Sequence, residues 1–175
     1  MATLYLDESK AKNYVFIGIL VQDGDAPRLR KRVAALKMPG QRSIHFVKES
    51  ERRRRKLIQE FLDLGFSAVR FESHENNQKL ARQECIRAIV KWAYLNQVKN
   101  LIFERDESAL VNDEKWLKDE IQKNGGLGTL GFLHLNRSDE PLLWVSDAIA
   151  WCDSRGGEWV RRFGQTIEES IKVRA

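Results

Sequence analysis

One segment of the chain, Leu142–Cys152, has the sequence LLWVSDAIAWC and is the most informative about the fold. It predicts a helix that is apolar on almost every side and therefore lies inside the protein. Its one carboxylate is Asp147. Leu143 and Trp151 lie one turn before and after this acid, so we expect the carboxylate to face the interior. A charge placed there costs several kcal/mol unless it is paired, hydrogen-bonded or bound to a cation.

Two further acids end apolar runs elsewhere in the chain. Asp7 closes the run that starts at Ala2, and Glu104 follows the run Val98–Phe103. Carboxylates at the ends of buried elements can converge, and their hard oxygen atoms are the ligands that Mg²⁺ and Mn²⁺ prefer. Together with Asp147, these acids are candidates for a divalent-metal site.

Length and composition favour a single globular domain spanning residues 1–175. Apolar residues make up 42% and charged residues 31% of the 175 residues, as is typical of soluble proteins. No apolar run approaches the roughly 20 residues of a membrane span, and no secretion signal is recognisable at the start, so we expect a cytoplasmic protein. Cys85 and Cys152 both lie in apolar helical patterns and are expected to be core residues.

The net charge of +5 and the pI near 9.3 favour a polyanion such as nucleic acid as partner, although 25 acids offset the 30 bases. The densest basic run opens a predicted helix after Ser50. Basic side chains there oppose the helix dipole, which suggests a use such as holding a backbone phosphate. A solvated helix face is the alternative. The candidate nucleic-acid-binding residues are Arg52, Arg53, Arg55 and Lys56.

The order of predicted elements indicates an α/β fold. Strands are predicted at residues 2–7, 13–21, 66–71, 98–104 and 130–135. Helices are predicted from Asp25 to Pro39-Gly40, from Ser50 to Gly65, at 77–96, at 113–123, from Glu140, and at 157–173. Residues 42–47 are expected to be extended. The first two strands should form an antiparallel hairpin, and the later alternation of strand and helix predicts parallel pairing. We therefore expect a mixed five-stranded sheet with helices on both faces.

Four stretches of the chain together resemble a known family. They are Asp7–Ser9 after a strand, Ile44–Phe46 before the Arg-rich helix, Leu101–Arg105 at a strand end, and Glu140–Ala148. In this order they resemble the family catalogued as domain of unknown function 3800, and the resemblance extends over nearly the whole chain. It implies a ribonuclease-H-like fold.

The resemblance also implies a site. Asp7, Glu104 and Asp147 would hold two Mg²⁺ or Mn²⁺ ions, as the acids of ribonuclease-H-like enzymes do. Two such ions can activate a water and stabilise the leaving oxygen of a phosphodiester displacement. His45 would assist by orienting the water, moving a proton or contacting a phosphate. Relatives often carry an acid two positions before this histidine, where the present chain has Ser43.

Each acid also has a simpler explanation. Asp7 could close the hairpin turn through its own backbone, and Asp147 could be a structural acid bonded to backbone or arginine. Glu104 competes with Asp106 for the strand-end position, because residues two apart share a face of a strand. Glu104 is preferred, since it is nearer the strand and matches the family pattern.

Two further acids and the three histidines also have structural interpretations. Glu8 should point away from Asp7 and serve as a rim or salt-bridge residue. Asp113 is most simply the N-cap of its helix, and His74 and His134 are expected to be incidental. His45 could likewise be a packed, hydrogen-bonded histidine.

Taken together, these observations predict a divalent-metal-dependent nuclease or related phosphodiester-processing protein with Asp7, His45, Glu104 and Asp147 as catalytic residues. The alternative is a catalytically inactive nucleic-acid-binding or accessory protein on the same fold. The substrate, the pathway and the oligomeric state are not indicated by the sequence.

Overall fold

The computed structural model of the protein describes residues 1–173. Their strands form one mixed sheet of six strands in the order β5-β4-β1-β2-β3-β6. The strands are β1 (Ala2–Ser9), β2 (Tyr14–Gln22), β3 (Ser67–Ser73), β4 (Val98–Glu104), β5 (Gly131–Leu135) and β6 (Ile167–Val173). β1 and β2 form the predicted antiparallel hairpin, and β3 adds antiparallel to β2. β4 pairs parallel to β1, β5 parallel to β4, and β6 parallel to β3. The predicted α/β class with a mixed sheet is confirmed.

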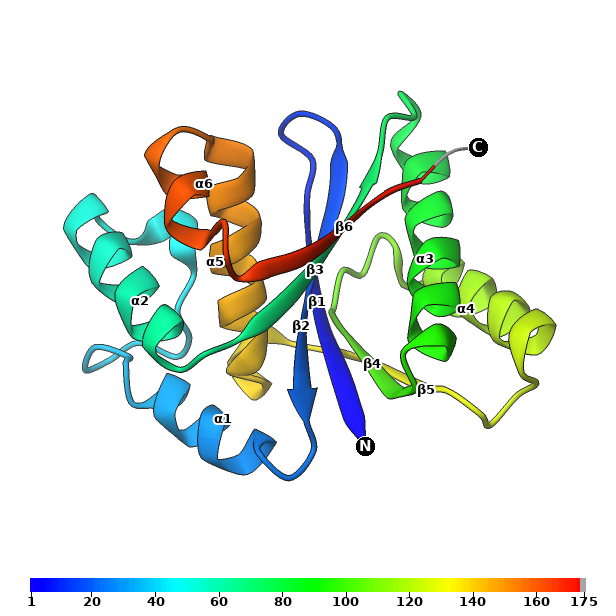
Figure 1. The fold of residues 1–175 in the computed structure, drawn as a ribbon, viewed down its shortest axis with the longest axis horizontal. Coiled ribbons are helices and arrows are strands. Elements are labelled where there is room, and N and C mark those ends of the chain that lie inside the picture. The colour runs from blue at the N-terminus through cyan, green and yellow to red at the C-terminus, as the bar shows by residue number, and fades with distance from the viewer. Residues whose placement is uncertain (174–175) are drawn as a thin grey trace.

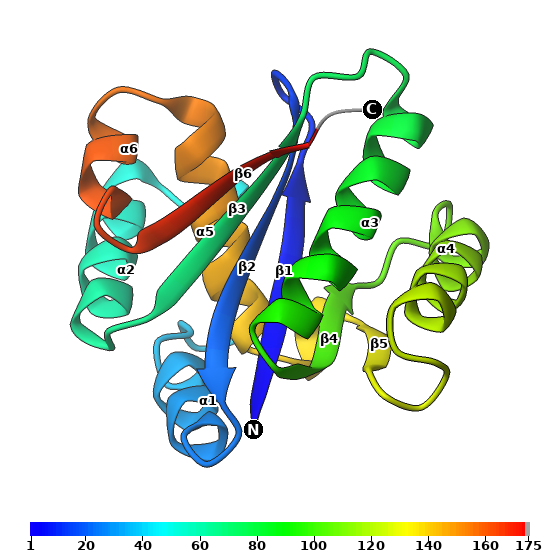
Figure 2. The ribbon, with the colours of Figure 1, turned by 45° about the vertical axis from the view of Figure 1, so that its right-hand side comes forward.

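Helices cover both faces of the sheet (Figures 1 and 2). The first face carries α1 (Ala26–Ala34), α2 (Glu51–Asp63), α5 (Leu142–Arg155) and α6 (Glu158–Phe163), and the second carries α3 (Gln78–Leu95) and α4 (Leu110–Asn124). Two short 3₁₀ turns are η1 (Phe46–Lys48) and η2 (Arg137–Asp139). Each face has its own cluster of buried apolar side chains, because alternate residues of the central strands point to opposite sides.

Helix α5 lies against the middle of the sheet, as the all-round apolar segment predicts. Its residues from Leu142 to Cys152 are buried, apart from Asp147 and Trp151, which are partly exposed. The Ser146 hydroxyl donates a hydrogen bond to the carbonyl oxygen of Tyr5 on β1, at 2.7 Å. This contact fixes the position of α5 relative to the end of β1, so it also positions Asp147.

The predicted helix at residues 157–173 is wrong in its second half. The helix ends at Phe163, and Ile167–Val173 form β6, which raises the strand count from five to six. β6 hydrogen-bonds along β3, whose outer edge would otherwise be left unpaired. The pattern of β6 is only weakly apolar, so its pairing partner rather than its own periodicity decides the structure.

Three boundaries also differ from the predictions. α1 ends at Ala34, well before Pro39-Gly40, and the expected extended segment at 42–47 turns into η1 at Phe46. α4 starts at Leu110, so Asp113 lies within its first turn and does not cap it.

Cys85 and Cys152 are buried free thiols, as expected. None of the helices within residues 1–173 is long and apolar enough to span a bilayer.

Candidate functional site

Three predicted acids meet at the carboxyl ends of β1 and β4, and we call Asp7, Glu104 and Asp147 the acid cluster. β1 and β4 are parallel neighbours, with Leu6 paired to Phe103, so Asp7 and Glu104 follow at the same edge of the sheet. Because side chains alternate along a strand, both acids point to the face that α5 covers.

Asp7 is the most deeply buried member of the acid cluster, with 5% of its surface exposed. Its Oδ1 accepts a hydrogen bond from the backbone N–H of Glu8 at 2.9 Å. Burial raises the pKa of Asp7 well above its usual value, and the negative charges of Glu8, Glu104 and Asp147 raise it further. Ionised acids at this end of β1 repel one another, and a bound cation would relieve that repulsion.

Asp147 connects α5 to the turn that carries His45. Its Oδ2 accepts a hydrogen bond from the backbone N–H of Phe46 at 2.9 Å. One oxygen of Asp147 therefore has a structural role, which was the alternative to metal binding for this acid. His45 is half-buried at the start of η1. Burial and the charge of Arg137 lower the pKa of His45, against the opposing charges of Asp147 and Glu104. The imidazole is therefore neutral at pH 7 and can accept a proton.

Arg137 belongs to the site and was not predicted. Its Nε and Nη2 each donate to one carboxylate oxygen of Glu104 at 3.0 Å, and Nη2 lies 3.7 Å from Oδ1 of Asp147. Its carbonyl oxygen accepts a hydrogen bond from Nε1 of Trp144 at 2.7 Å, which anchors η2 to α5. The one signal in the sequence is its position, two residues after β5, because parallel strands end at a common edge.

The donor atoms of the acid cluster suit a divalent cation, but their present arrangement is incomplete. Asp7 forms no ion pair with the side chains of residues 1–173, so its buried carboxylate is a free hard-oxygen ligand beside Glu104. Within the same residues, however, no group of three or more His, Cys, Asp or Glu is arranged to hold a metal. In this arrangement the guanidinium of Arg137 engages both oxygens of Glu104.

The additional candidate acids lie outside the acid cluster. Glu8 points to the opposite face of the sheet, where its Oε1 lies 3.4 Å from Nη1 of Arg82. Asp113 is fully buried and forms two hydrogen bonds of 2.7 Å with Arg82. Asp106 accepts hydrogen bonds from the backbone N–H and hydroxyl of Ser108, at 3.0 and 2.6 Å. Of the two competing strand-end acids, Glu104 is the one beside Asp7.

His134 is not incidental in the structure. Its Nε2 lies 3.1 Å from Oδ2 of Asp113, and its ring stacks on Phe103 with centroids 5.3 Å apart. His134 therefore completes the second group of charged side chains, which we call the Arg82 cluster. Its members are Glu8, Tyr14, Arg82, Asp113 and His134.

The Arg-rich start of α2 divides into anchored and exposed side chains. Arg53 donates to the carbonyl oxygen of Leu36, and Arg55 pairs with Glu158 at 3.2 Å. Arg52 and Lys56 are exposed and form no ion pair within residues 1–173. These two side chains are therefore the ones free to contact a phosphate.

Arg54, which was not among the candidates, has a structural role at η1. Its Nε donates to the carbonyl oxygen of Phe46 at 2.9 Å, and its Nη2 to that of Val47 at 2.7 Å. Its guanidinium also lies over the ring of Trp151, 4.4 Å from the centroid. The Arg-rich helix thus fixes the turn that carries His45.

Comparison with solved structures identifies the fold. The chain is similar to a chain in the structure of the PCNA:RNase HII complex from Archaeoglobus fulgidus, with a TM-score of 0.57 and 17% sequence identity. The match covers 94% of this chain and 77% of that chain. No protein-family model and no curated protein matches the chain. At this identity the likeness shows the fold, and the protein accordingly has a ribonuclease-H-like α/β fold.

Proposed function

We propose that the protein is a divalent-metal-dependent nuclease, or a related phosphodiester-processing enzyme, that acts on nucleic acid. The proposal depends on one observation, the buried Asp7 carboxylate beside Glu104 and Asp147 at the end of β1. The ribonuclease-H-like fold supports it, as does the similarity to a structure that contains RNase HII. We further propose that the chain is a single domain of the family catalogued as domain of unknown function 3800.

In this proposal Asp7, Glu104 and Asp147 would hold Mg²⁺ or Mn²⁺. A pair of such ions, when bound, activates a water and stabilises the leaving oxygen of a phosphodiester. Neutral His45 would accept a proton from the attacking water, and exposed Arg52 and Lys56 would hold the backbone.

Arg137 has a defined part in the proposal. The guanidinium of Arg137 engages both oxygens of Glu104 and would therefore compete with a cation for this carboxylate, so in the proposal Arg137 leaves Glu104 when cations bind. Its charge would then be available to a substrate phosphate, for which arginine is well suited.

The test is cleavage of labelled RNA, DNA and RNA–DNA hybrid with Mg²⁺ or Mn²⁺. Asp7→Asn and Asp147→Asn should each lower the rate by at least about 100-fold, because both remove a charged ligand from the reacting centre. Asp119→Asn, an exposed acid on α4, is the matched control and should cleave like the wild type. Circular dichroism checks that the variants fold. A wild-type protein that cleaves none of these substrates with either ion would show the proposal to be wrong.

A second function is favoured by the same arginine. Arg137 pairs with Glu104 and lies near Asp147, and Ser43 stands where the family that the chain resembles often carries an acid. A catalytically inactive nucleic-acid-binding or accessory protein would have such a site. Its binding would weaken with salt and would not respond to EDTA.

A further inference from the structure

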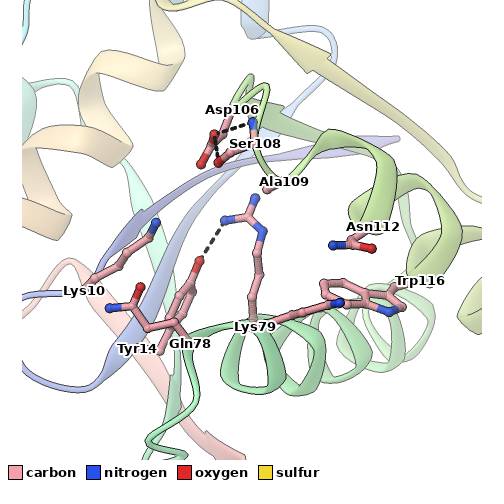
Figure 3. A pocket seen from close by; sticks show the side chains of 10 residues that line it. Lys10, Tyr14, Gln78, Lys79, Asp106, Ser108, Ala109, Asn112 and Trp116 are labelled. Atoms are coloured by element: carbon pink, nitrogen blue, oxygen red, sulfur yellow. Dashed lines mark hydrogen bonds between the residues drawn. The ribbon is translucent and has the colours of Figure 1, made fainter.

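A cavity of about 190 Å³ lies on the second face of the sheet, away from the acid cluster. It is an open hollow between the loops that follow β1 and β4 and the N-terminal halves of α3 and α4 (Figure 3). Figure 3 shows Lys10 and Gln78 on one side and Trp116 and Asn112 of α4 on the other. None of these residues has a role in the proposed chemistry.

The positive charge at the mouth of the cavity comes from Lys10 and Lys79, because Asp113 and Glu8 balance the charge of Arg82. Arg82, 5% exposed, lines it and is held in place by Asp113 and by the hydroxyl of Tyr14, to which its Nη1 donates at 2.8 Å. The ammonium groups of Lys10 and Lys79 are exposed at its rim. Asp106 is the one acid in the lining, and Ser108 already bonds its carboxylate. An anionic group is therefore the ligand that the lining favours.

One wall of the cavity is aromatic and carries an amide. Trp116 is half-exposed, and Asn112 lies four residues earlier on the same side of α4. An indole offers a flat surface on which any nucleobase can stack, and a carboxamide can both donate to and accept from a base edge. A free phosphate would use the lysines and leave this wall without a function.

We propose that this cavity binds one unpaired nucleotide of a single strand. The base would stack on Trp116, and the adjoining phosphate would contact Lys10 and Lys79. Cationic groups beside an exposed aromatic ring are the combination by which proteins hold single-stranded nucleic acid. The volume is below the roughly 300–1,000 Å³ of pockets for drug-sized ligands, which limits the occupant to about one nucleotide.

The position of the cavity connects it to the acid cluster. Lys10 follows Asp7 by three residues and Asp106 follows Glu104 by two, so both sites open at the same edge of the sheet. A strand that crosses this edge can occupy both. The inference rests on the proposed nucleic-acid partner and narrows it to a substrate with an unpaired segment.

The test measures binding of fluorescein-labelled 12-nucleotide oligo(dT) and oligo(U) by anisotropy in EDTA. Trp116→Ala should weaken binding by about 5- to 100-fold, whereas Trp116→Phe, which keeps an aromatic face, should change it by less than about 3-fold. Lys79→Ala should lower the slope of log K against log salt by about 0.7. Lys91→Ala, an exposed lysine on α3 outside the cavity, is its control and should leave the slope unchanged.

The outcomes separate this inference from the proposed enzyme. The inference would be overturned if the Trp116→Ala variant bound single strands as tightly as the wild type does. It would also be overturned if the wild type bound duplexes but no single strand. Thermal melting identifies a Trp116→Ala variant that fails to fold, and the Lys79→Ala slope then decides. Binding in EDTA is independent of cleavage, so a Trp116 effect without any nuclease activity would refute only the proposed enzyme.

Discussion

The two charged clusters on opposite faces of β1 bury their acids to a similar degree but neutralise them very differently. In the Arg82 cluster both oxygens of Asp113 accept hydrogen bonds of 2.7 Å from Arg82. In the acid cluster Asp7 accepts its hydrogen bond from a backbone N–H, and the nearby arginine, Arg137, engages Glu104 instead. One buried acid is fully paired, and the other is surrounded by like charges.

The pKa of each acid reports this difference. Burial opposes ionisation of Asp113, but hydrogen bonds from Arg82 and His134 keep its pKa below the usual value. Burial and three neighbouring negative charges raise the pKa of Asp7 well above it. Burial of an acid therefore does not by itself indicate a functional residue. The absence of a compensating cation around Asp7 within residues 1–173 is what marks its cluster as a candidate binding site.

The largest expected change in stability comes from a substitution that breaks the Arg82–Asp113 pair of the Arg82 cluster. Asp113→Asn should lower the free energy of unfolding by about 3–5 kcal/mol, because it removes the closest acid from the buried Arg82 guanidinium and leaves only Glu8, at 3.4 Å, to balance its charge. Urea denaturation measures the change. Asp119→Asn, exposed on the same helix, should stay within about 0.5 kcal/mol of the wild type. A loss below about 1 kcal/mol for Asp113→Asn would mean that the two clusters do not differ in the way described.

An intermediate effect concerns the arginine of the acid cluster. Arg137→Gln should cost about 1–3 kcal/mol in EDTA, because the charged hydrogen bonds to Glu104 are lost. The same change frees Glu104, so added MnCl₂ should raise the melting temperature of this variant more than that of the wild type. Arg161→Gln, exposed on α6, is the control. Equal Mn²⁺ shifts in variant and wild type would show that Arg137 does not compete with a cation.

The smallest expected effect has the opposite sign. Asp7→Asn should raise the free energy of unfolding by about 0.2–1 kcal/mol at pH 7 in EDTA, because it removes like-charge repulsion between neighbouring strands. Urea denaturation at fixed pH measures it. A destabilised Asp7→Asn variant would indicate that the carboxylate has a structural partner after all.

The pH dependence of stability separates the same two acids. The raised pKa of Asp7 means that the folded chain keeps a proton that the unfolded chain releases near pH 3.9, so stability from Asp7 falls as pH rises through the folded pKa. The lowered pKa of Asp113 has the reverse consequence, with stability present above pH 3.9 and lost as the pH falls through its folded pKa. The free energy of unfolding can be measured for the wild type and for Asp7→Asn from pH 4 to 8. The decline with rising pH that comes from Asp7 should be present in the wild type and absent from the variant.

Much of the fold was predictable because it is encoded in local patterns. The β1–β2 hairpin, the long helix at 77–96 and the buried helix around Asp147 were each indicated by periodicity and end signals within one segment. The meeting of Asp7 with Glu104 also followed, since adjacent parallel strands end at one edge. The metal-binding role of these acids stays a prediction.

Only the tertiary structure decided which charged side chains and which strands from distant parts of the chain pair with one another. Asp113 lies 31 residues from Arg82, and Arg137 lies 33 residues from Glu104, at spacings that no helix or strand period specifies. β6 likewise becomes a strand because β3 offers it an edge. Periodicity shows which side of an element is buried, but the register of the sheet determines which charge it meets there. Whether a buried acid is neutralised is therefore settled only by the folded arrangement.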